Sequence, residues 1–308
     1  MKAARLHVRG DLRSLRYEDA PDPRPKTGQV LIRVHAAGVT PSEIQWSPTS
    51  VTRAGTPRPV PIILGHEFSG EVAELSNDVT ELRAGDAVYG LNDWFIDGAN
   101  AEYCVAQAAE IARKPASIDH VHAAVVPISG LTAWQGLFDR AHLRRGQRVL
   151  VHGGAGAVGV CAVQLAHRCG AHVMTTVSPH NADFVHGLGA DEVIDYHKVR
   201  FEDVVRGADV VFDTVGGETL QRSSAVLQPG GRLVTVAADG EGTTNAATRA
   251  AFFIVQPNAS QLAELARMTD AGEFRPIVDA AFPLARALEA YGHRTQRGKA
   301  ALRVIDRS

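Results

Sequence analysis

The sequence predicts an α/β protein, in which a parallel, doubly wound sheet in the second half of the chain accompanies a smaller β-rich domain. Three observations support this prediction. Apolar segments of strand length alternate with helical segments from Arg148 onward, and the first of them runs into a glycine-rich break at 153–159. Residues 1–110 consist instead of short strand-like segments separated by Gly and Pro, which is typical of a small barrel-like β domain.

The β-rich part contains one clear strand and two extended loops. Residues 30–36 alternate apolar and other residues with period two, so we expect one face of this strand to be buried. Three prolines between positions 21 and 25 indicate a loop before it. A second loop, 47–61, carries four prolines and a glycine. A further strand is predicted in the segment GHEFSGEVAEL, which contains Gly65 and Gly70.

The pattern changes near Pro115. Residues 118–143 are helical in character, with interruptions expected at Pro127 and at Ser129–Gly130. Parallel strands are then predicted at 148–152, 172–177, 192–195, 209–213 and 232–237, with 251–255 as the sixth strand of a six-stranded sheet. The tail is predicted to hold a helix at 259–271, a strand at 277–281, a helix at 284–291 and a strand at 300–305.

The glycine-rich break is the strongest chemical signal. It reads Gly154-x-Gly156-x-x-Gly159 between a predicted strand and a predicted helix, Val160–Cys169, that Gly170 can cap. Glycines at this spacing permit a tight turn, close approach of a pyrophosphate and close helix–strand packing, and the helix N-terminus offers N–H groups to the anion. The motif therefore predicts a dinucleotide site.

Composition restricts the other function classes. At 308 residues the chain is long enough for two domains, and a net charge of −2 gives no reason to expect a nucleic-acid or membrane partner. Cys161 and Cys169 are eight residues apart on one predicted helix, too far apart to form a disulfide. The N-terminus lacks the apolar core of a signal peptide, so we expect a cytoplasmic protein.

Several motifs, in order, resemble those of the medium-chain dehydrogenase/reductase superfamily. They are GHEFSGEV, RAGDAVYG, VLVHGGAGAVG, GADEVIDY, DTVGG and LQPGGRLVTVA. The chain is most similar to the zinc-free NADPH:quinone oxidoreductases, the zeta-crystallin-like branch. The resemblance implies a GroES-like catalytic domain formed by 1–118 and 256–308, a Rossmann NADP(H)-binding domain at 119–255, and a homodimer.

NADP(H) is the predicted cofactor. Ser178 ends the second strand of the nucleotide domain, where NAD-binding folds carry an acidic residue, and its hydroxyl and His180 can donate to a 2′-phosphate. The resemblance places Tyr196 at the same phosphate, although no lysine or arginine follows the strand. Ser178 has a second interpretation, as a cap of the next helix. The predicted cofactor-binding residues are Gly154, Ala155, Gly156, Val158, Gly159, Ser178, His180, Tyr196, Val215, Ala237 and Lys299.

A catalytic zinc is not expected. Thr40 stands where zinc-bearing relatives of the family have a cysteine, and residues 127–132 offer no third ligand. His66 and Glu67 alone fall short of the roughly three protein ligands that a catalytic zinc needs. We therefore interpret His66 as a packed, hydrogen-bonded residue and predict no metal site.

The resemblance implies an active site beside the nicotinamide, for which Thr40, Ser42, Trp46 and Thr132 are the candidate catalytic residues. Trp94 is a further candidate for the lining, and both tryptophans can equally be core or lid residues. The predicted reaction is hydride transfer from NADPH to a quinone or an α,β-unsaturated carbonyl. The alternatives are an NADPH-binding protein with little turnover and a zinc-free enoyl reductase.

Overall fold

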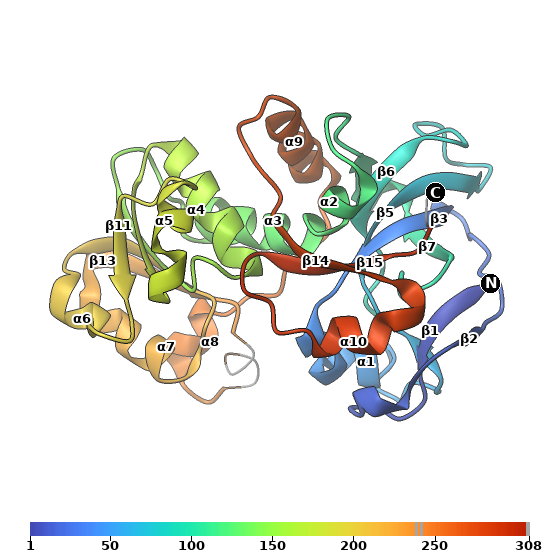
Figure 1. The fold of residues 1–308 in the computed structure, drawn as a ribbon, viewed down its shortest axis with the longest axis horizontal. Coiled ribbons are helices and arrows are strands. Elements are labelled where there is room, and N and C mark those ends of the chain that lie inside the picture. Colours follow the sequence, from blue (N-terminus) through green and yellow to red (C-terminus); the bar gives the residue numbers. More distant parts are fainter. Residues whose placement is uncertain (238–239, 241–242, 306–308) are drawn as a thin grey trace. The chain divides into compact units, whose positions relative to one another are not determined.

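The structure, a computed structural model, describes residues 1–237, 240 and 243–305 and divides into two compact units (Figure 1). Unit 1 contains Met1–Ile128, Pro257–Thr295 and the chain from Lys299 onward, and unit 2 contains Ser129–Gln256 and Gln296–Gly298. The predicted division after residue 118 therefore falls too early. Helix α2 (His120–Ala124) packs on two strands of unit 1 and belongs to it.

Unit 1 is built from two sheets. One has the order β2-β1-β4, and the seven-stranded sheet has the order β14-β15-β3-β5-β6-β8 with β7 paired to β3. The strands are β1 (Lys2–Leu6), β2 (Leu15–Asp19), β3 (Gln29–Gly38), β4 (Ile62–Ile63), β5 (Glu67–Leu75), β6 (Ala87–Leu91), β7 (Tyr103–Gln107), β8 (Ile111–Arg113), β14 (Val278–Pro283) and β15 (Lys299–Arg303). Helices α1 (Ser47–Ser50), α9 (Ala259–Asp270) and α10 (Ala287–Gly292) complete it with α2.

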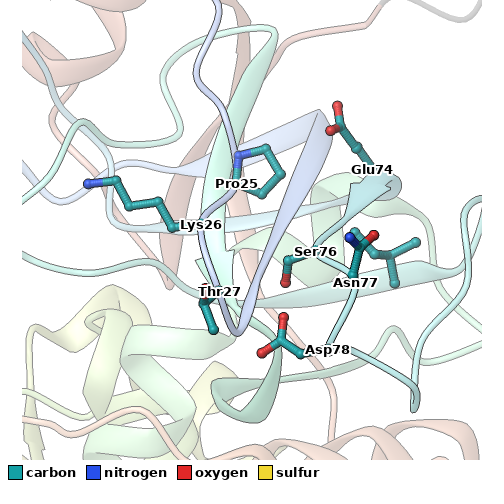
Figure 2. Close-up of a pocket in the computed structure, with 8 residues that line it drawn as sticks. Pro25, Lys26, Thr27, Glu74, Ser76, Asn77 and Asp78 are labelled. Atoms are coloured by element: carbon teal, nitrogen blue, oxygen red, sulfur yellow. The ribbon is translucent and has the colours of Figure 1, made fainter.

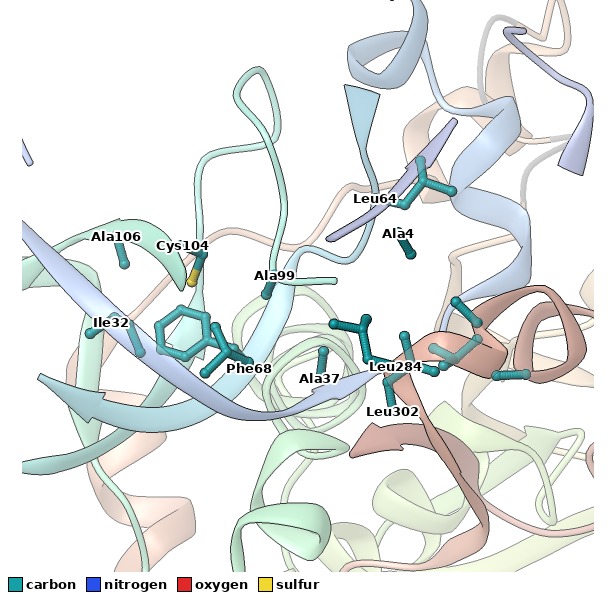
Figure 3. Close-up of a cluster of buried hydrophobic side chains, with 14 of the residues drawn as sticks. Ala4, Ile32, Ala37, Leu64, Phe68, Ala99, Cys104, Ala106, Leu284 and Leu302 are labelled. Atoms are coloured by element: carbon teal, nitrogen blue, oxygen red, sulfur yellow. The ribbon is translucent and has the colours of Figure 1, made fainter. Parts of the chain in front are cut away.

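The two ends of the chain share this large sheet, as the resemblance implies. Strand β15, drawn in red in Figure 1, pairs antiparallel with β3, drawn in blue. The period-two prediction for β3 is confirmed, because Val30, Ile32, Val34 and Ala36 are all fully buried. Val30, Ile32 and Val34 join a core that includes residues from both chain ends, such as Leu302 (Figure 3).

Unit 2 contains a parallel sheet of order β11-β10-β9-β12-β13. Its strands are β9 (Arg148–His152), β10 (His172–Val177), β11 (Glu192–Asp195), β12 (Ala208–Asp213) and β13 (Leu227–Thr235). Its helices are α3 (Pro127–Trp134, which begins at the unit boundary), α4 (Ala157–Cys169), α5 (Ala182–His186), α6 (Phe201–Val204), α7 (Gly217–Ser223) and α8 (Ala246–Ala251). The predicted bounds of the first three strands are confirmed. Strand β13 starts earlier than predicted, because Pro229 is tolerated in a strand at the edge of a sheet.

The predicted sixth strand is reduced to one residue. Among the described residues the sheet has five strands, and Phe252 forms only an isolated parallel bridge to Thr235. The reason is local: Phe252 donates its N–H back to Thr248 at 3.0 Å and so ends helix α8, and Ile254 is 49% exposed. The six-stranded sheet is therefore corrected to five strands and a bridge.

The predicted helical region 118–143 forms α2, α3 and a π-helical turn over Gln135–Arg140. Pro127 starts α3 rather than breaking a helix, because proline fits the first helical turn, where its missing N–H costs nothing. Gly130 lies inside that helix. Within the described part of the chain, no helix combines the length and apolarity needed to cross a membrane.

Candidate active site

Three glycines in the turn of unit 2 are required by the backbone conformation or by packing, whereas a fourth, Gly156, is not. Gly153 has φ 77°, a left-handed conformation, and a Cβ at Gly154 would overlap the Thr175 hydroxyl of the neighbouring strand β10. A Cβ at Gly159 would overlap the carbonyl oxygen of Gly153. At Gly156 the backbone is ordinary, and an added Cβ would meet nothing closer than that same oxygen, at 3.4 Å. Packing therefore does not require a glycine at this position, and the missing side chain would let a ligand approach the backbone.

Helix α4 begins at this open position. Gly156 is its N-cap, and no side chain in the described structure caps it. The first N–H groups of the helix consequently lack intrahelical partners, and the helix dipole adds positive potential at the same end. This arrangement fits a pyrophosphate, so the residues present suit a dinucleotide.

The other predicted cofactor residues follow the carboxyl ends of the remaining strands. Ser178 follows β10, Tyr196 follows β11, Val215 follows β12 and Ala237 follows β13. In a parallel sheet these ends share one edge, which is where such folds bind ligands. The hydroxyl oxygens of Ser178 and Tyr196 lie 2.7 Å apart. Neither residue supplies a positive charge.

The structure brings a cation to this edge that sequence reasoning missed. Arg297 donates from Nε to Oδ1 of Asn181 at 2.8 Å and from Nη2 to the carbonyl oxygen of His180 at 3.0 Å. Gly298 donates to the carbonyl oxygen of Ala155 at 2.8 Å, which fixes this strand-like segment against the glycine turn. Arg297 is 116 residues from Asn181 along the chain, so no local motif could have shown it.

Lys299, which is predicted to bind the cofactor, lies in unit 1 and is already paired with a carboxylate. Its side chain is buried and its ammonium group pairs with Oε1 of Glu67, whose Oε2 accepts from the N–H of Ile128 at 2.9 Å. Burial raises the pKa of Glu67, and the positive charge of Lys299 opposes that rise. A contact between Lys299 and a cofactor stays a prediction.

A buried polar network lies behind the candidate catalytic residues of unit 1. The carboxylate of Glu43 is fully buried and accepts from the backbone N–H of Gly65 at 3.1 Å, from the hydroxyl of Tyr291, and from Nδ1 of His66, which is 3.1 Å away. Burial and the neighbouring carboxylate raise the pKa of Tyr291 well above its ordinary value, so the phenol stays protonated. Asn100 donates to the same hydroxyl at 2.8 Å. His66 is thus a packed, hydrogen-bonded residue, as interpreted from the sequence.

Two tryptophan rings pack beside this network, and Thr40 begins the turn that carries one of its members. Thr40 begins the 3₁₀ turn that carries Glu43, and Trp46 ends it. Trp46 packs edge-on against Trp94 with ring centres 5.4 Å apart, and Trp94 lies 5.3 Å from the ring of His66. Among the described residues, Oγ1 of Thr40, Nε2 of His66 and Nε1 of Trp94 are buried atoms without a hydrogen-bond partner.

The remaining two predicted catalytic residues are placed differently. Ser42 is exposed on the first turn after Thr40. Thr132 is buried on α3 in unit 2, so the predicted set is divided between the two units. Their shared role in one site stays a prediction.

The residues at this site do not suit a catalytic zinc. Thr40 supplies no thiolate, and both oxygens of Glu67 are engaged, by Lys299 and by the backbone of Ile128. Within the described residues, one set of three His, Cys, Asp or Glu ligand atoms converges, and His66 is not part of it. A zinc ion at His66 would have too few protein ligands.

Neither of two hollows on the surface of unit 1 is lined by a predicted site residue. One, of about 430 Å³, lies between the segments 25–27 and 74–78, where Figure 2 shows Lys26, Glu74 and Asp78 on its rim. The other, of about 570 Å³, lies between β8 and α9. Neither contains a group of titratable residues arranged for catalysis.

Two protein families match the chain. Residues 26–116 match the family described as alcohol dehydrogenase GroES-like domain. Residues 188–301 match the family described as zinc-binding dehydrogenase.

Individual proteins match over almost the full chain. A mitochondrial NAD(P)H oxidoreductase of Danio rerio is 30% identical, covering 90% of this chain and 84% of that protein. A chloroplastic NADPH-dependent alkenal/one oxidoreductase of Arabidopsis thaliana is 33% identical, covering 88% and 70%. The solved structure of a quinone oxidoreductase from Coxiella burnetii superposes with a TM-score of 0.89 at 31% identity, covering 99% of both chains.

Proposed function

This chain belongs to the medium-chain dehydrogenase/reductase superfamily, in its quinone oxidoreductase branch, and we propose that it transfers a hydride from NADPH to a quinone or an α,β-unsaturated carbonyl without zinc. The proposal follows from one observation above all. The position that would hold a zinc ligand set instead carries a hydrogen-bonded network of Glu43, His66 and Tyr291 beside the unpartnered hydroxyl of Thr40. Relatives named for alkenal, enone and quinone substrates support the same substrate class.

The glycine turn and the edge of the unit 2 sheet would hold the cofactor. The N–H groups at the start of α4 would bind the pyrophosphate in the space left at Gly156. The hydroxyls of Ser178 and Tyr196 and the guanidinium of Arg297 would bind the 2′-phosphate, which favours NADP(H) over NAD(H). The arginine would contribute mainly its positive charge, because Nε and Nη2 already donate to Asn181 and to the carbonyl oxygen of His180.

The bound nicotinamide supplies the hydride, and the protein's own residues must stabilise the charge that arrives with it. Quinones and conjugated enones accept a hydride without a metal because the charge is delocalised onto an oxygen. A fixed donor aimed at that oxygen lowers the barrier most, since it needs no reorganisation during the reaction. We assign this role to the hydroxyl of Thr40, which has no competing partner among the described residues.

We assign the proton to His66. Glu43 orients the ring through its contact with Nδ1, and Nε2, which has no hydrogen-bond partner among the described residues, would donate to the substrate. Tyr291 and the N–H of Gly65 fix the carboxylate of Glu43 in place. The histidine is thus oriented from behind by a carboxylate, and its second nitrogen is left for the substrate.

The test is steady-state oxidation of NADPH by the purified protein with a panel of ortho-quinones, para-quinones and simple enones. We expect turnover with at least one class, and His66→Gln should lower kcat while NADPH still binds. Tight NADPH binding with no turnover above background across both classes would support the alternative, an NADPH-binding protein. Turnover with unactivated alcohols would contradict the zinc-free reaction.

A further inference from the structure

Two histidines and a glutamate lie together on one face of the large sheet of unit 1. His35 lies on β3, Glu71 on the neighbouring strand β5, and His120 is the first residue of α2, which packs on both strands. The pairing register of β3 with β5 shifts at His35, so His35 is the extra residue of a bulge. Bulges redirect a side chain and occur often beside functional sites. Arg33 is directly opposite Glu71, and His35, two residues further on, faces the same side.

The distances suit a single ion. Each of the three side chains brings one ligand atom to within 4.8 Å of the other two. Nε2 of His35 lies 3.6 Å from Oε1 of Glu71, and the rings of His35 and His120 have centres 4.1 Å apart. Ligands about 2.1 Å from a tetrahedral zinc ion lie about 3.4 Å from one another. The first pair is therefore already near its coordinated separation, and the ligand atom of the half-buried His120 lies within 4.8 Å of both.

Neighbouring residues hold two of the ligand side chains in position. The hydroxyl of Ser69 lies 2.8 Å from Nδ1 of His120 and 3.3 Å from the carbonyl oxygen of Val88, so it holds the ring through Nδ1. A proton on Nδ1 leaves the lone pair of a neutral His120 ring on Nε2. Arg33 pairs with Oε2 of Glu71, while Oε1 of the same carboxylate lies toward Nε2 of His35. Histidines that bind metals are oriented through their other nitrogen in this way.

We propose that His35, Glu71 and His120 form a binding site for a divalent transition metal of the zinc type, with water completing the coordination. Two imidazoles and one carboxylate are a ligand set that zinc accepts. The ion would link β3, β5 and α2 and so stabilise unit 1. The site shares no residue with the proposed catalytic network, and the inference does not depend on the proposed reaction.

The experiment is a zinc titration of the full-length protein after treatment with a chelator, in competition with a chromophoric chelator. We expect one zinc ion per chain and a rise in the unfolding temperature on zinc addition. Both should be lost in His120→Ala and in Glu71→Gln. Ser69→Ala, which removes the partner of Nδ1, should weaken binding by about ten- to a hundredfold. The matched control is His122→Ala, an exposed histidine on the same helix, which should bind zinc as the unmodified protein does.

Two results would overturn the proposal. One is no zinc binding by the unmodified protein while its secondary structure is intact by circular dichroism. The other is zinc binding that persists in His120→Ala and disappears in His66→Gln, which would place the ion at the catalytic network. NADPH binding by each variant, measured by fluorescence, shows that a variant lacking zinc binding has nevertheless folded.

Discussion

The hydroxyl oxygens of Ser178 and Tyr196 lie 2.7 Å apart at the ends of two adjacent parallel strands. Both residues were predicted from the sequence to contact the cofactor, and the structure makes them one polar pair. Arg297 reaches the same segment through Asn181 and the carbonyl oxygen of His180. Two hydroxyls and a guanidinium are a suitable set for a phosphate monoester.

The first prediction concerns Arg297. Arg297→Ala should raise the Kd for NADPH by about ten- to a hundredfold, because hydrogen bonds to charged groups contribute about 1.5–3 kcal/mol. The Kd for NADH should change little, since NADH has no 2′-phosphate, and Ser178→Asp should shift the preference further toward NADH. Fluorescence titration with both cofactors measures this, with Arg206→Ala, at the opposite edge of the sheet, as the control. Equal affinity of the unmodified protein for NADPH and NADH would refute the assignment.

The second prediction compares two glycines of one turn. Gly159→Ala should destabilise the protein by about 1–3 kcal/mol, because its Cβ overlaps the carbonyl oxygen of Gly153. Gly156→Ala should cost less than about 1 kcal/mol, mainly through the poorer N-cap, yet weaken NADPH binding by roughly tenfold. Thermal unfolding and fluorescence titration of both variants separate the two effects. Unchanged NADPH affinity in Gly156→Ala would show that the pyrophosphate does not bind at this position.

Patterns of neighbouring residues predicted the features that are formed by one segment of the chain. They did not predict the features that depend on contacts between segments distant in the sequence. Alternation in β3 and the glycine turn after β9 are consecutive in sequence, so their physical cause is visible there. Arg297 reaches the cofactor edge only because the chain returns to unit 2 for three residues. His35 meets Glu71 and His120 through a bulge, which no periodicity reveals. Phe252 does not continue the predicted strand, because its N–H donates to Thr248 at the end of helix α8. The apolar run in the sequence does not show this hydrogen bond.

The third prediction is a pH dependence of stability. Burial, with the charge of Arg222 adding to it, lowers the pKa of His152 to about 4 from an ordinary value of 6.5. The unfolded chain therefore binds a proton between these values that the folded chain does not. Stability is complete above pH 6.5 and falls as the pH drops toward 4, by up to about 3 kcal/mol.

His152→Gln should flatten this dependence. Urea unfolding at neutral pH and at about pH 5 measures it, and the unmodified protein should lose about 2 kcal/mol more than the variant on acidification. His180→Gln, which removes an exposed histidine of the same unit, is the control and should keep the dependence of the unmodified protein. An equal loss in His152→Gln would mean that other groups govern acid stability.

The fourth prediction is that turnover needs no zinc. Protein treated with a chelator should retain its NADPH-dependent activity, because the network around His66 lacks a ligand set for the ion. Zinc found in the untreated protein should be absent from His120→Ala, whose activity should nevertheless equal that of the unmodified protein. Activity that is lost on chelation and restored by zinc would contradict the proposed mechanism.

The last prediction concerns the hydroxyl of Thr40. Thr40→Val keeps the shape of the side chain and removes its donor, so the acceptor oxygen would develop its negative charge without a hydrogen bond. Loss of one such donor costs on the order of 10²-fold in kcat at comparable sites. The affinity for NADPH should stay nearly unchanged, because the proposed cofactor contacts lie on the glycine turn and on the edge of the unit 2 sheet.

Single-turnover and steady-state kinetics with the best quinone or enone would measure this split between kcat and cofactor affinity. Thr56→Val is the matched control, since it removes an exposed hydroxyl from the same loop. If Thr40→Val and Thr56→Val had equal, small effects on kcat, Thr40 would be a structural residue, and the charge on the oxygen would have to be stabilised by His66 alone. If Thr40→Val instead weakened NADPH binding and left kcat unchanged, the hydroxyl would belong to the cofactor site.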